Sequence, residues 1–279
     1  YYLTLEPTVS FWDCGEYIST AYKLEVGHPP GAPLFQLFGR FFSLFASDTS
    51  QVAFMINLMS AFFSALTILF LFWTITALSK KIILKSNDLS KSNIIAIIGS
   101  GLVGSLAYTF SDSFWFSAVE GEVYGMSSFF TAITFWAILK WESEADDKYA
   151  SRWIILISFI IGLSIGVHLL NLLAIPAVIF IYYFKKHETS LIGILKVFLL
   201  AIIATGGIQG LIIPGIVSLA GKFELFFVNS AGLPFNSGTI IYFSLISAII
   251  ISGLFVNKKI KSPFLGMGLV SFAFILIGY

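Results

Sequence analysis

The sequence predicts an all-α fold, a polytopic transmembrane helical bundle. Of its 279 residues, 57% are hydrophobic and only 11% are charged, whereas soluble domains carry charge at about a quarter of their positions. The apolar residues gather in runs close to the roughly 20 residues that a helix needs to cross a bilayer. The net charge of +1 gives no reason to expect nucleic acid as a partner. Membrane lipid is therefore the expected surroundings of most of the chain.

Eight apolar segments are predicted to be membrane helices. In chain order they cover residues 52–78, 94–110, 123–141, 153–168, 170–184, 191–219, 238–256 and 264–279. The sixth is long, and its glycines together with Pro214 are expected to bend or break it. Because the sequence starts without Met and ends in an apolar run, we expect residues 1–279 to be a single-domain fragment. A preceding ninth helix and a C-terminal part would then be missing.

The distribution of Lys and Arg predicts the orientation of these helices. If the loop that holds Asp13 lies outside, 13 of the 16 basic residues fall on the inner side and 9 of the 15 acidic residues on the outer side. The inner basic residues are then Lys80, Lys81, Lys85, Lys91, Lys140, Lys148, Arg152, Lys185, Lys186, Lys196, Lys258, Lys259 and Lys261. This arrangement follows the positive-inside rule, which the opposite orientation would break in nearly every loop.

The first outer loop, residues 7–51, is predicted to contain two helices at the membrane interface. Residues 13–24 and 33–45 have the composition of helices, and the second is apolar on most sides. The stiff His28-Pro29-Pro30-Gly31 sequence separates them. Two further outer loops are expected at residues 111–122 and 220–237.

The fourth and fifth predicted membrane helices are joined without a polar loop. Residues 168–171 alone connect them, so we expect this hairpin to turn before it reaches the outer surface. Such a turn leaves a recess on the outer side, with His168 and Asn171 in its floor. Polar groups at membrane depth usually face protein or water, not lipid.

Asp13 and Glu16 are the leading candidates for catalysis. They are three residues apart, so both side chains can share one face of a helix. Local sequence alone favours a capping box without chemistry, in which Asp13 is the N-cap and Glu16 the third helical residue. Acids held beside lipid are costly, however, and a carboxylate here could accept the proton of a hydroxyl nucleophile as a general base.

Glu120 and Glu122 lie in the next outer loop, at the start of the third membrane helix. One of the two is expected to be a solvated loop acid. The other could add a carboxylate to the Asp13 site, where it would orient the acceptor or bind a metal. Two isolated acids are a weak metal signal, so a divalent metal is possible but not indicated.

The outer-side groups that can carry positive charge are candidates for binding a phosphate. Arg suits phosphate oxygens best, which draws attention to Arg40, while His28 and His168 are the outer histidines. Arg40, His168 and Lys222 each have a structural alternative that is at least as good. Arg40 could snorkel from an interfacial helix, and His168 could be a hydrogen-bonded core residue. Lys23 and Lys222 complete this outer group.

Two motifs in the first outer loop carry a resemblance to a known family. The D-x-G-E element is Asp13-Cys14-Gly15-Glu16, and the H-P-P-G-x-P-L element runs from His28 to Leu34. Together with the later segments EGEVYGMSS and GVHLLNLLAIPA, they resemble a bacterial membrane protein family common in Bacteroidetes. That family is similar to the animal transmembrane O-mannosyltransferase that acts on plexin-type receptors.

The resemblance implies a branch of the GT-C glycosyltransferases, polytopic enzymes with an essential acid in the first outer loop. Such enzymes take a sugar, here mannose or another hexose, from a polyprenyl-phosphate carrier and need no cofactor in the present interpretation. The acceptor would be a protein Ser or Thr hydroxyl, and the site would face the periplasm from a bacterial inner membrane. Carried over to this chain, Asp13 is the catalytic base and Glu16 its neighbour. His28, Arg40, Glu120, Glu122, His168 and Asn171 are the substrate-binding candidates.

Two other classes of function remain open at this stage. A proton- or ion-coupled transporter or flippase would use the same acids to bind protons or cations. The acids cluster in outer loops instead of within the helices, which argues against a relay across the bilayer. A non-catalytic scaffold for secretion or envelope assembly is the third class.

Overall fold

The structure is a computed structural model, and it describes residues 1–29, 31–83 and 90–279. These described residues form helices and connecting loops, with no strand among them. The α-helices are α1 Cys14–Lys23, α2 Pro33–Ser43, α3 Val52–Ile83, α4 Lys91–Thr109, α5 Asp112–Val119, α6 Val123–Ser143, α7 Ser151–Ile165, α8 Ala174–Lys186, α9 Leu191–Gly207, α10 Ile213–Leu225, α11 Ser237–Ile260 and α12 Pro263–Gly278. The predicted all-α class is confirmed.

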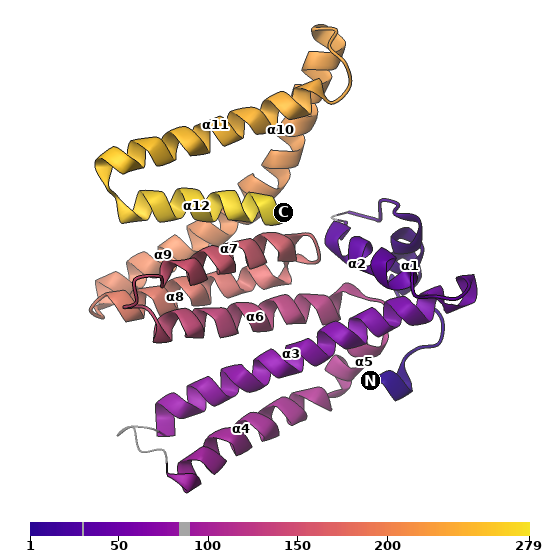
Figure 1. Cartoon of the computed structure of the whole chain (residues 1–279), viewed down its shortest axis with the longest axis vertical. Helices are drawn as coiled ribbons and strands as arrows, with labels where there is room; N and C mark the ends of the chain where they lie inside the picture. The colour runs from indigo at the N-terminus through magenta and orange to yellow at the C-terminus, as the bar shows by residue number, and fades with distance from the viewer. Residues whose placement is uncertain (30, 84–89) are drawn as a thin grey trace.

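The long helices lie side by side, and the short ones gather at one end of the bundle (Figure 1). Helix α3 packs against α4 and α6, while α7 packs against α6 and α12. Helices α1 and α2 contact each other and the start of α3. The same end carries α5, so both of the first two predicted outer loops meet there (Figure 1).

The chain is a multi-pass membrane protein. Among the described residues, five helical segments are long and apolar enough to cross a membrane, namely Thr49–Ile83, Lys91–Thr109, Leu169–Lys186, Leu191–Ser230 and Ser237–Ile260. A sixth is added if α5 and α6, which bend by 115° at their junction, are counted as one span. The remaining apolar helices, Ser151–Ile165 and Leu265–Gly278, are shorter than a full span. For these two, membrane crossing stays a prediction.

Helix α7 is short because its backbone is diverted before it reaches the predicted end. The carbonyl of Gly166 accepts a hydrogen bond from the Leu34 N–H of α2 at 2.8 Å. His168 then accepts the Leu170 N–H on its ring Nδ1 at 3.1 Å and opens the 3₁₀ turn Leu169–Leu173. This turn ties the α7–α8 connection to the first outer loop.

The prediction for residues 191–237 is correct about the break and wrong about the end. At the expected bend, the structure has a π-helical segment, Ile208–Ile212, just before Pro214. Pro214 has no backbone N–H, and this interrupts the α-helical hydrogen bonds. The helix does not stop at residue 219, however, because α10 continues to Leu225 and a second π-helical segment reaches Ser230. The carboxylate of Glu224 accepts the N–H groups of Asn236 and Thr239, at 2.5 and 2.9 Å, and so caps α11.

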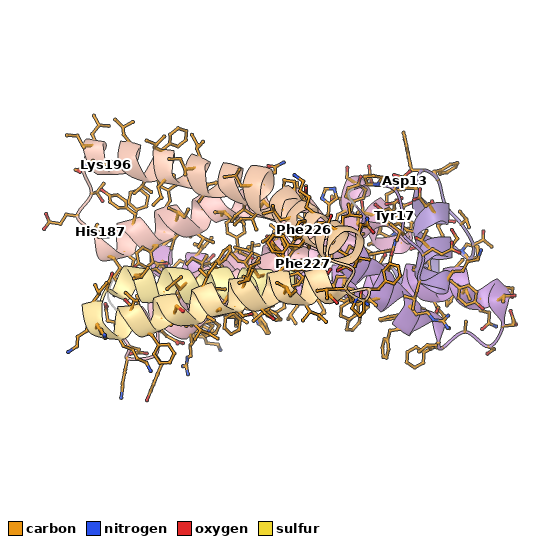
Figure 2. All side chains as sticks on the ribbon, turned by 90° about the horizontal axis from the view of Figure 1, so that it is seen from above. Asp13, Tyr17, His187, Lys196, Phe226 and Phe227 are labelled. Carbon is orange, nitrogen blue, oxygen red and sulfur yellow. The ribbon has the colours of Figure 1, made fainter. Side chains whose placement is uncertain are left out.

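Residues predicted to lie on opposite sides of the membrane are found at opposite ends of the bundle. Figure 2 shows His187 and Lys196 at one end of the molecule and Asp13 and Tyr17 at the other. The acids of the opposite end partly neutralise its lysines, since Lys81 pairs with Glu142 and Lys186 with Asp146. Two residues used in the predictions, Lys85 and Pro30, lie outside the described residues.

Both helices predicted in the first outer loop are present, shorter by one or two residues at their ends. Helix α2 buries Phe35 in a cluster that includes Ile56 of α3, and large apolar side chains of this segment are exposed. The exposed side chains are Leu37, Phe38 and Phe41 of α2, followed by Leu44 and Phe45 just after its end. A helix with one face on protein and one apolar face uncovered is typical of a position in the membrane interface.

The crossing of α1 and α2 depends on Gly39. A Cβ added at Gly39 would lie 2.8 Å from the Cβ of Ala21, closer than such atoms approach. Replacing Gly39 by Ala is therefore expected to destabilise the protein by about 1–3 kcal/mol, the usual cost of overpacking. Thermal unfolding followed by tryptophan fluorescence would measure it. Gly99→Ala in α4, where the new Cβ meets nothing within 4 Å, should be neutral or slightly stabilising.

Candidate active site

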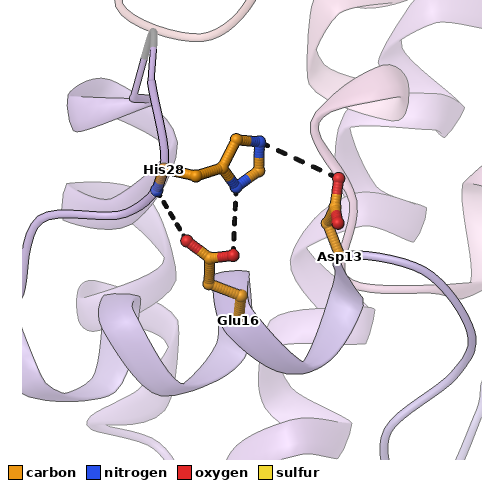
Figure 3. Close-up of side chains that lie close together, drawn as sticks. All are labelled: Asp13, Glu16 and His28. Atoms are coloured by element: carbon orange, nitrogen blue, oxygen red, sulfur yellow. Dashed lines mark hydrogen bonds and ion pairs between the residues drawn. The ribbon is translucent and has the colours of Figure 1, made fainter.

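His28 bridges Asp13 and Glu16 at the end of the bundle where α1 begins (Figure 3). Glu16 accepts the backbone N–H of His28 at 2.6 Å and contacts the ring Nδ1 at 3.0 Å. The other ring nitrogen, Nε2, lies 3.8 Å from Oδ2 of Asp13. The two motifs of the first outer loop thus meet in space, although twelve residues separate Glu16 from His28.

The expected capping box at the start of α1 is not formed. Asp13 occupies the N-cap position, but its side chain makes no cap hydrogen bond. Glu16 is the third helical residue and turns its carboxylate to His28 instead of back to the N-cap. Both carboxylates are therefore left for interactions outside the helix.

The contact between Glu16 and His28 favours the charged form of both groups. Two hydrogen bonds from His28 lower the pKa of Glu16, and the hydrogen bond with Glu16 raises the pKa of His28. The negative charges of Glu16 and Asp13 raise the pKa of His28 further. The imidazole thus lies between two carboxylates that favour its charged form, and ligand atoms of all three residues lie within 4.8 Å of one another. This spacing would also accept a divalent cation.

Glu120 and Glu122 form a second acidic group in the break between α5 and α6. Both are buried, with exposed fractions of 3% and 4%, so neither is the solvated loop acid that was expected. One carboxylate oxygen of each has no hydrogen-bond partner among the described residues. Burial raises the pKa of Glu122 to about 7, and the charges of Glu120 and Asp13 add to the effect. Glu122 therefore belongs electrostatically to the Asp13 site.

Glu122→Gln is expected to change how stability depends on pH. The folded wild type holds the Glu122 proton to about pH 7, whereas an ordinary glutamate loses it near 4.5. The wild type should therefore lose stability as pH rises between these values, by about 3 kcal/mol in all. Gln carries no charge to bury, so the variant should be the more stable protein at about pH 8 and similar to wild type at about pH 5. Denaturant or thermal unfolding at both pH values measures this.

The exposed Glu188→Gln provides the matched control for this pH test, because a surface carboxylate has no burial to oppose its charge. Equal pH profiles for wild type and Glu122→Gln would mean that Glu122 stays ionised and solvated.

His28 and His168 each lie beside a tyrosine ring. The Tyr17 ring lies 5.8 Å from the His28 ring, and Tyr124 lies 5.6 Å from His168. Burial raises the pKa of Tyr17 to about 12, with the charge of Glu122 adding to it. His168 is half-buried, and burial lowers its pKa, which favours the neutral imidazole. The surroundings of the two histidines therefore shift their pKa values in opposite directions.

Asn57 of α3 supports the site and was missed by the sequence analysis. It is fully buried, and its side-chain amide donates to the carbonyl oxygens of Glu6 and Thr8 at 2.6 and 2.9 Å. These bonds hold the segment that leads into Asp13. The available signal was an amide within the first turns of an otherwise apolar helix, since polar groups at such depth need partners.

Two of the substrate-binding candidates lie elsewhere. Arg40 donates to the Tyr22 carbonyl at 3.0 Å and lies over the Tyr22 ring, so it joins α2 to the last turns of α1, away from Asp13. Asn171 is fully buried and donates to Ser164 at 3.0 Å. The structure brings together Asp13, Glu16, His28, Glu120 and Glu122. His168 contacts Tyr124 instead, and Arg40 and Asn171 lie outside this group.

An apolar cavity of about 370 Å³ lies beside the turn that the short hairpin forms. Its walls include Pro33 of α2, Ile165 of α7 and Leu169 of the 3₁₀ turn, closed by Ile216 of α10 and Tyr279. A recess was expected at this place with polar residues in its floor. The cavity is instead lined mostly by hydrocarbon, and it begins five residues after His28.

Comparisons with known proteins agree with the resemblance found in the sequence. A family model described as "Protein O-mannosyl-transferase TMEM260 N-terminal domain" matches residues 13–191, which contain every candidate site residue. The chain is 32% identical over 134 residues to the protein O-mannosyl-transferase tmem260 of Dictyostelium discoideum, covering 48% of the chain and 14% of that protein. It is 28% identical over 163 residues to the TMEM260 protein of Mus musculus, covering 58% of the chain and 21% of that protein.

The chain spans about a fifth or less of the length of these curated relatives. No solved structure matches it. The family model begins at Asp13 and covers 179 of the 279 residues. Since the match takes in well over half of the sequence, the chain belongs to the family described as the protein O-mannosyl-transferase TMEM260 N-terminal domain.

Proposed function

We propose that this chain is the membrane part of a protein O-mannosyl-transferase, acting as one GT-C-like unit. It transfers mannose or another hexose from a polyprenyl-phosphate carrier to a Ser or Thr hydroxyl of a protein on the outer side, the periplasm of a bacterium. The observation that carries this proposal is the Asp13–His28–Glu16 group, where an exposed carboxylate lies 3.8 Å from an imidazole whose other nitrogen contacts Glu16. The names of the two relatives support the reaction class.

The proposed reaction needs one base and one cation. The acceptor oxygen attacks the anomeric carbon on the face opposite the phosphate, and the bond from that carbon to the phosphate oxygen breaks. Asp13 takes the hydroxyl proton, and the phosphate leaves with the bonding electrons. Because the attack comes from the opposite face, the configuration at the anomeric carbon is inverted. His28, whose pKa is raised by its contact with Glu16, stabilises the charge on the departing phosphate in its protonated form. No cofactor is required in this scheme.

The apolar cavity beside Pro33 supports a lipid-borne donor. Its walls come from α2, α7, α10, α11 and α12, and its lining residue Pro33 follows His28 by five residues in the chain. In the proposed complex the phosphate lies at His28 and the isoprenoid tail occupies this cavity. A sugar nucleotide, by contrast, would need polar groups for its base and ribose.

Filling the cavity is expected to weaken the use of a polyprenyl donor. Ile216→Phe places extra bulk in it, and the KM for the polyprenyl-phosphate sugar should rise about 10-fold, equivalent to about 1.4 kcal/mol. The rate at saturating donor should stay the same, because the reacting groups are not touched. A donor with a short, water-soluble tail should show no change. Steady-state kinetics of Ile216→Phe against Ile249→Phe, an exposed position of α11, measures the effect.

The decisive experiment offers membranes containing the protein a polyprenyl-phosphate mannose and a Ser/Thr-containing acceptor protein. The expected result is an acceptor that has gained the mass of one hexose, located at a hydroxyl residue by mass spectrometry. Counterflow of the lipid-linked sugar in proteoliposomes, without a glycosylated product, would identify a transporter instead. An unchanged cellular phenotype after joint replacement of Asp13, Glu16 and His28 would identify a scaffold.

A further inference from the structure

A second cavity, of about 650 Å³, lies between α3, α4 and α6 at the end of the bundle away from Asp13. Helices α3 and α6 begin beside the candidate active site and end at this cavity, so the two places are a full helix length apart (Figure 1). None of the residues that line it belongs to the site of sugar transfer. A molecule bound in this cavity would therefore be bound apart from the candidate active site.

The wall of this cavity nearer the bundle centre is aromatic. Trp73 of α3 and Trp136 of α6 face each other with ring centroids 5.8 Å apart and planes inclined by 36°. Trp73 is 39% exposed, so the cavity opens on the surface of the helices. Tryptophan collects where hydrocarbon meets lipid headgroups, which places this wall at the boundary of a leaflet.

The rim of the cavity at the ends of α3 and α6 is basic. Lys80 and Lys81 end α3, and Lys140 lies near the end of α6. Among the described residues, ion pairs at this rim use one carboxylate, Glu142, which binds Lys81. Lys140 lies 5.9 Å from the Trp136 ring centroid. Three ammonium groups against one carboxylate favour an anionic occupant.

We propose that this cavity binds an anionic phospholipid of the leaflet at that end of the bundle, with its phosphate at Lys80 and Lys140 and the upper part of an acyl chain against Trp73 and Trp136. Seven residues separate Trp73 from Lys80, or roughly 10 Å along the helix, which matches the step from a phosphate to the first carbons of the chains. Basic pockets between membrane helices bind lipid headgroups in this way. A free phosphate has no apolar part that could contact the aromatic wall.

The test counts lipids retained by the purified protein in native mass spectrometry. Wild-type protein is mixed with phosphatidylglycerol, with phosphatidylcholine or with inorganic phosphate. Wild type is expected to retain one tightly bound phosphatidylglycerol, and Lys80→Gln/Lys140→Gln should bind it roughly 10- to 30-fold more weakly. Lys258→Gln/Lys259→Gln at the end of α11, which removes two lysines outside the cavity, should bind it as wild type does.

Three outcomes would overturn the proposal. Equal retention of phosphatidylglycerol by wild type and Lys80→Gln/Lys140→Gln would place the lipid elsewhere. Equal retention of phosphatidylcholine would remove the role of charge. Displacement of the lipid by millimolar inorganic phosphate would make this a site for a free anion. A thermal shift with phosphatidylglycerol, seen in wild type and absent from Lys80→Gln/Lys140→Gln, is the second measurement, and it does not depend on sugar transfer.

Discussion

Replacing Asp13 by Asn is expected to lower the rate of sugar transfer by roughly 10²- to 10⁴-fold, the usual contribution of a general base. Asn keeps the size and shape of the side chain but cannot accept the hydroxyl proton. The loss should appear in kcat, with little change in KM, since the acceptor and donor still meet the same surfaces. Initial rates at saturating donor and acceptor measure it.

The variant is expected to fold normally. The Asp13 side chain is 60% exposed and makes no cap hydrogen bond in α1, so little of the packing depends on its charge. Asp112→Asn, an exposed acid in the first turn of α5, is the matched control and should transfer at the wild-type rate. Full activity in Asp13→Asn would refute the role of Asp13 as the general base. Glu122, the buried acid with a raised pKa, would then be the next candidate.

The fold could be predicted largely from the sequence because lipid imposes simple rules on length and polarity. The helix expected at residues 13–24 is found at Cys14–Lys23, and the next begins at Pro33 as expected. The end of the sixth span could not be predicted in this way. Residues 220–230 contain a lysine and a glutamate, which resemble a loop, but Glu224 serves as the N-terminal cap of α11. That use depends on a contact made only after folding.

The candidate site, too, could be predicted from the sequence only in part. Asp13, Glu16 and His28 are visible as motifs, whereas the burial of Glu120 and Glu122 follows from the 115° bend between α5 and α6. No periodicity in the sequence encodes that angle. Arg40 is the opposite case, because its residue type points to phosphate, whereas in the structure its guanidinium donates to the Tyr22 carbonyl. Residue types thus identify candidates, and only hydrogen-bond partners decide which ones are free to act.

His28→Gln is expected to slow transfer roughly 100-fold at about pH 6, the lower end of the cost of losing one donor that stabilises an anion. It should also change the pH profile. The contact with Glu16 raises the pKa of His28 above 6.5, so wild-type activity should be full below that raised pKa and fall as pH rises through it. Gln cannot lose a proton in this range, so the variant should lack the alkaline fall. Rates measured from about pH 5.5 to 9 give both results.

Glu16→Gln separates this interpretation from a purely structural role for His28. Without the Glu16 charge and its hydrogen bond, the pKa of His28 should drop, and the alkaline fall should move to lower pH. Activity would then be near wild type at acidic pH and clearly lower at about pH 8. Glu122 also titrates near pH 7, so Glu122→Gln must be measured alongside. If the alkaline fall persists in His28→Gln and vanishes in Glu122→Gln, the titrating group is Glu122, and the charge of His28 has no part in releasing the phosphate.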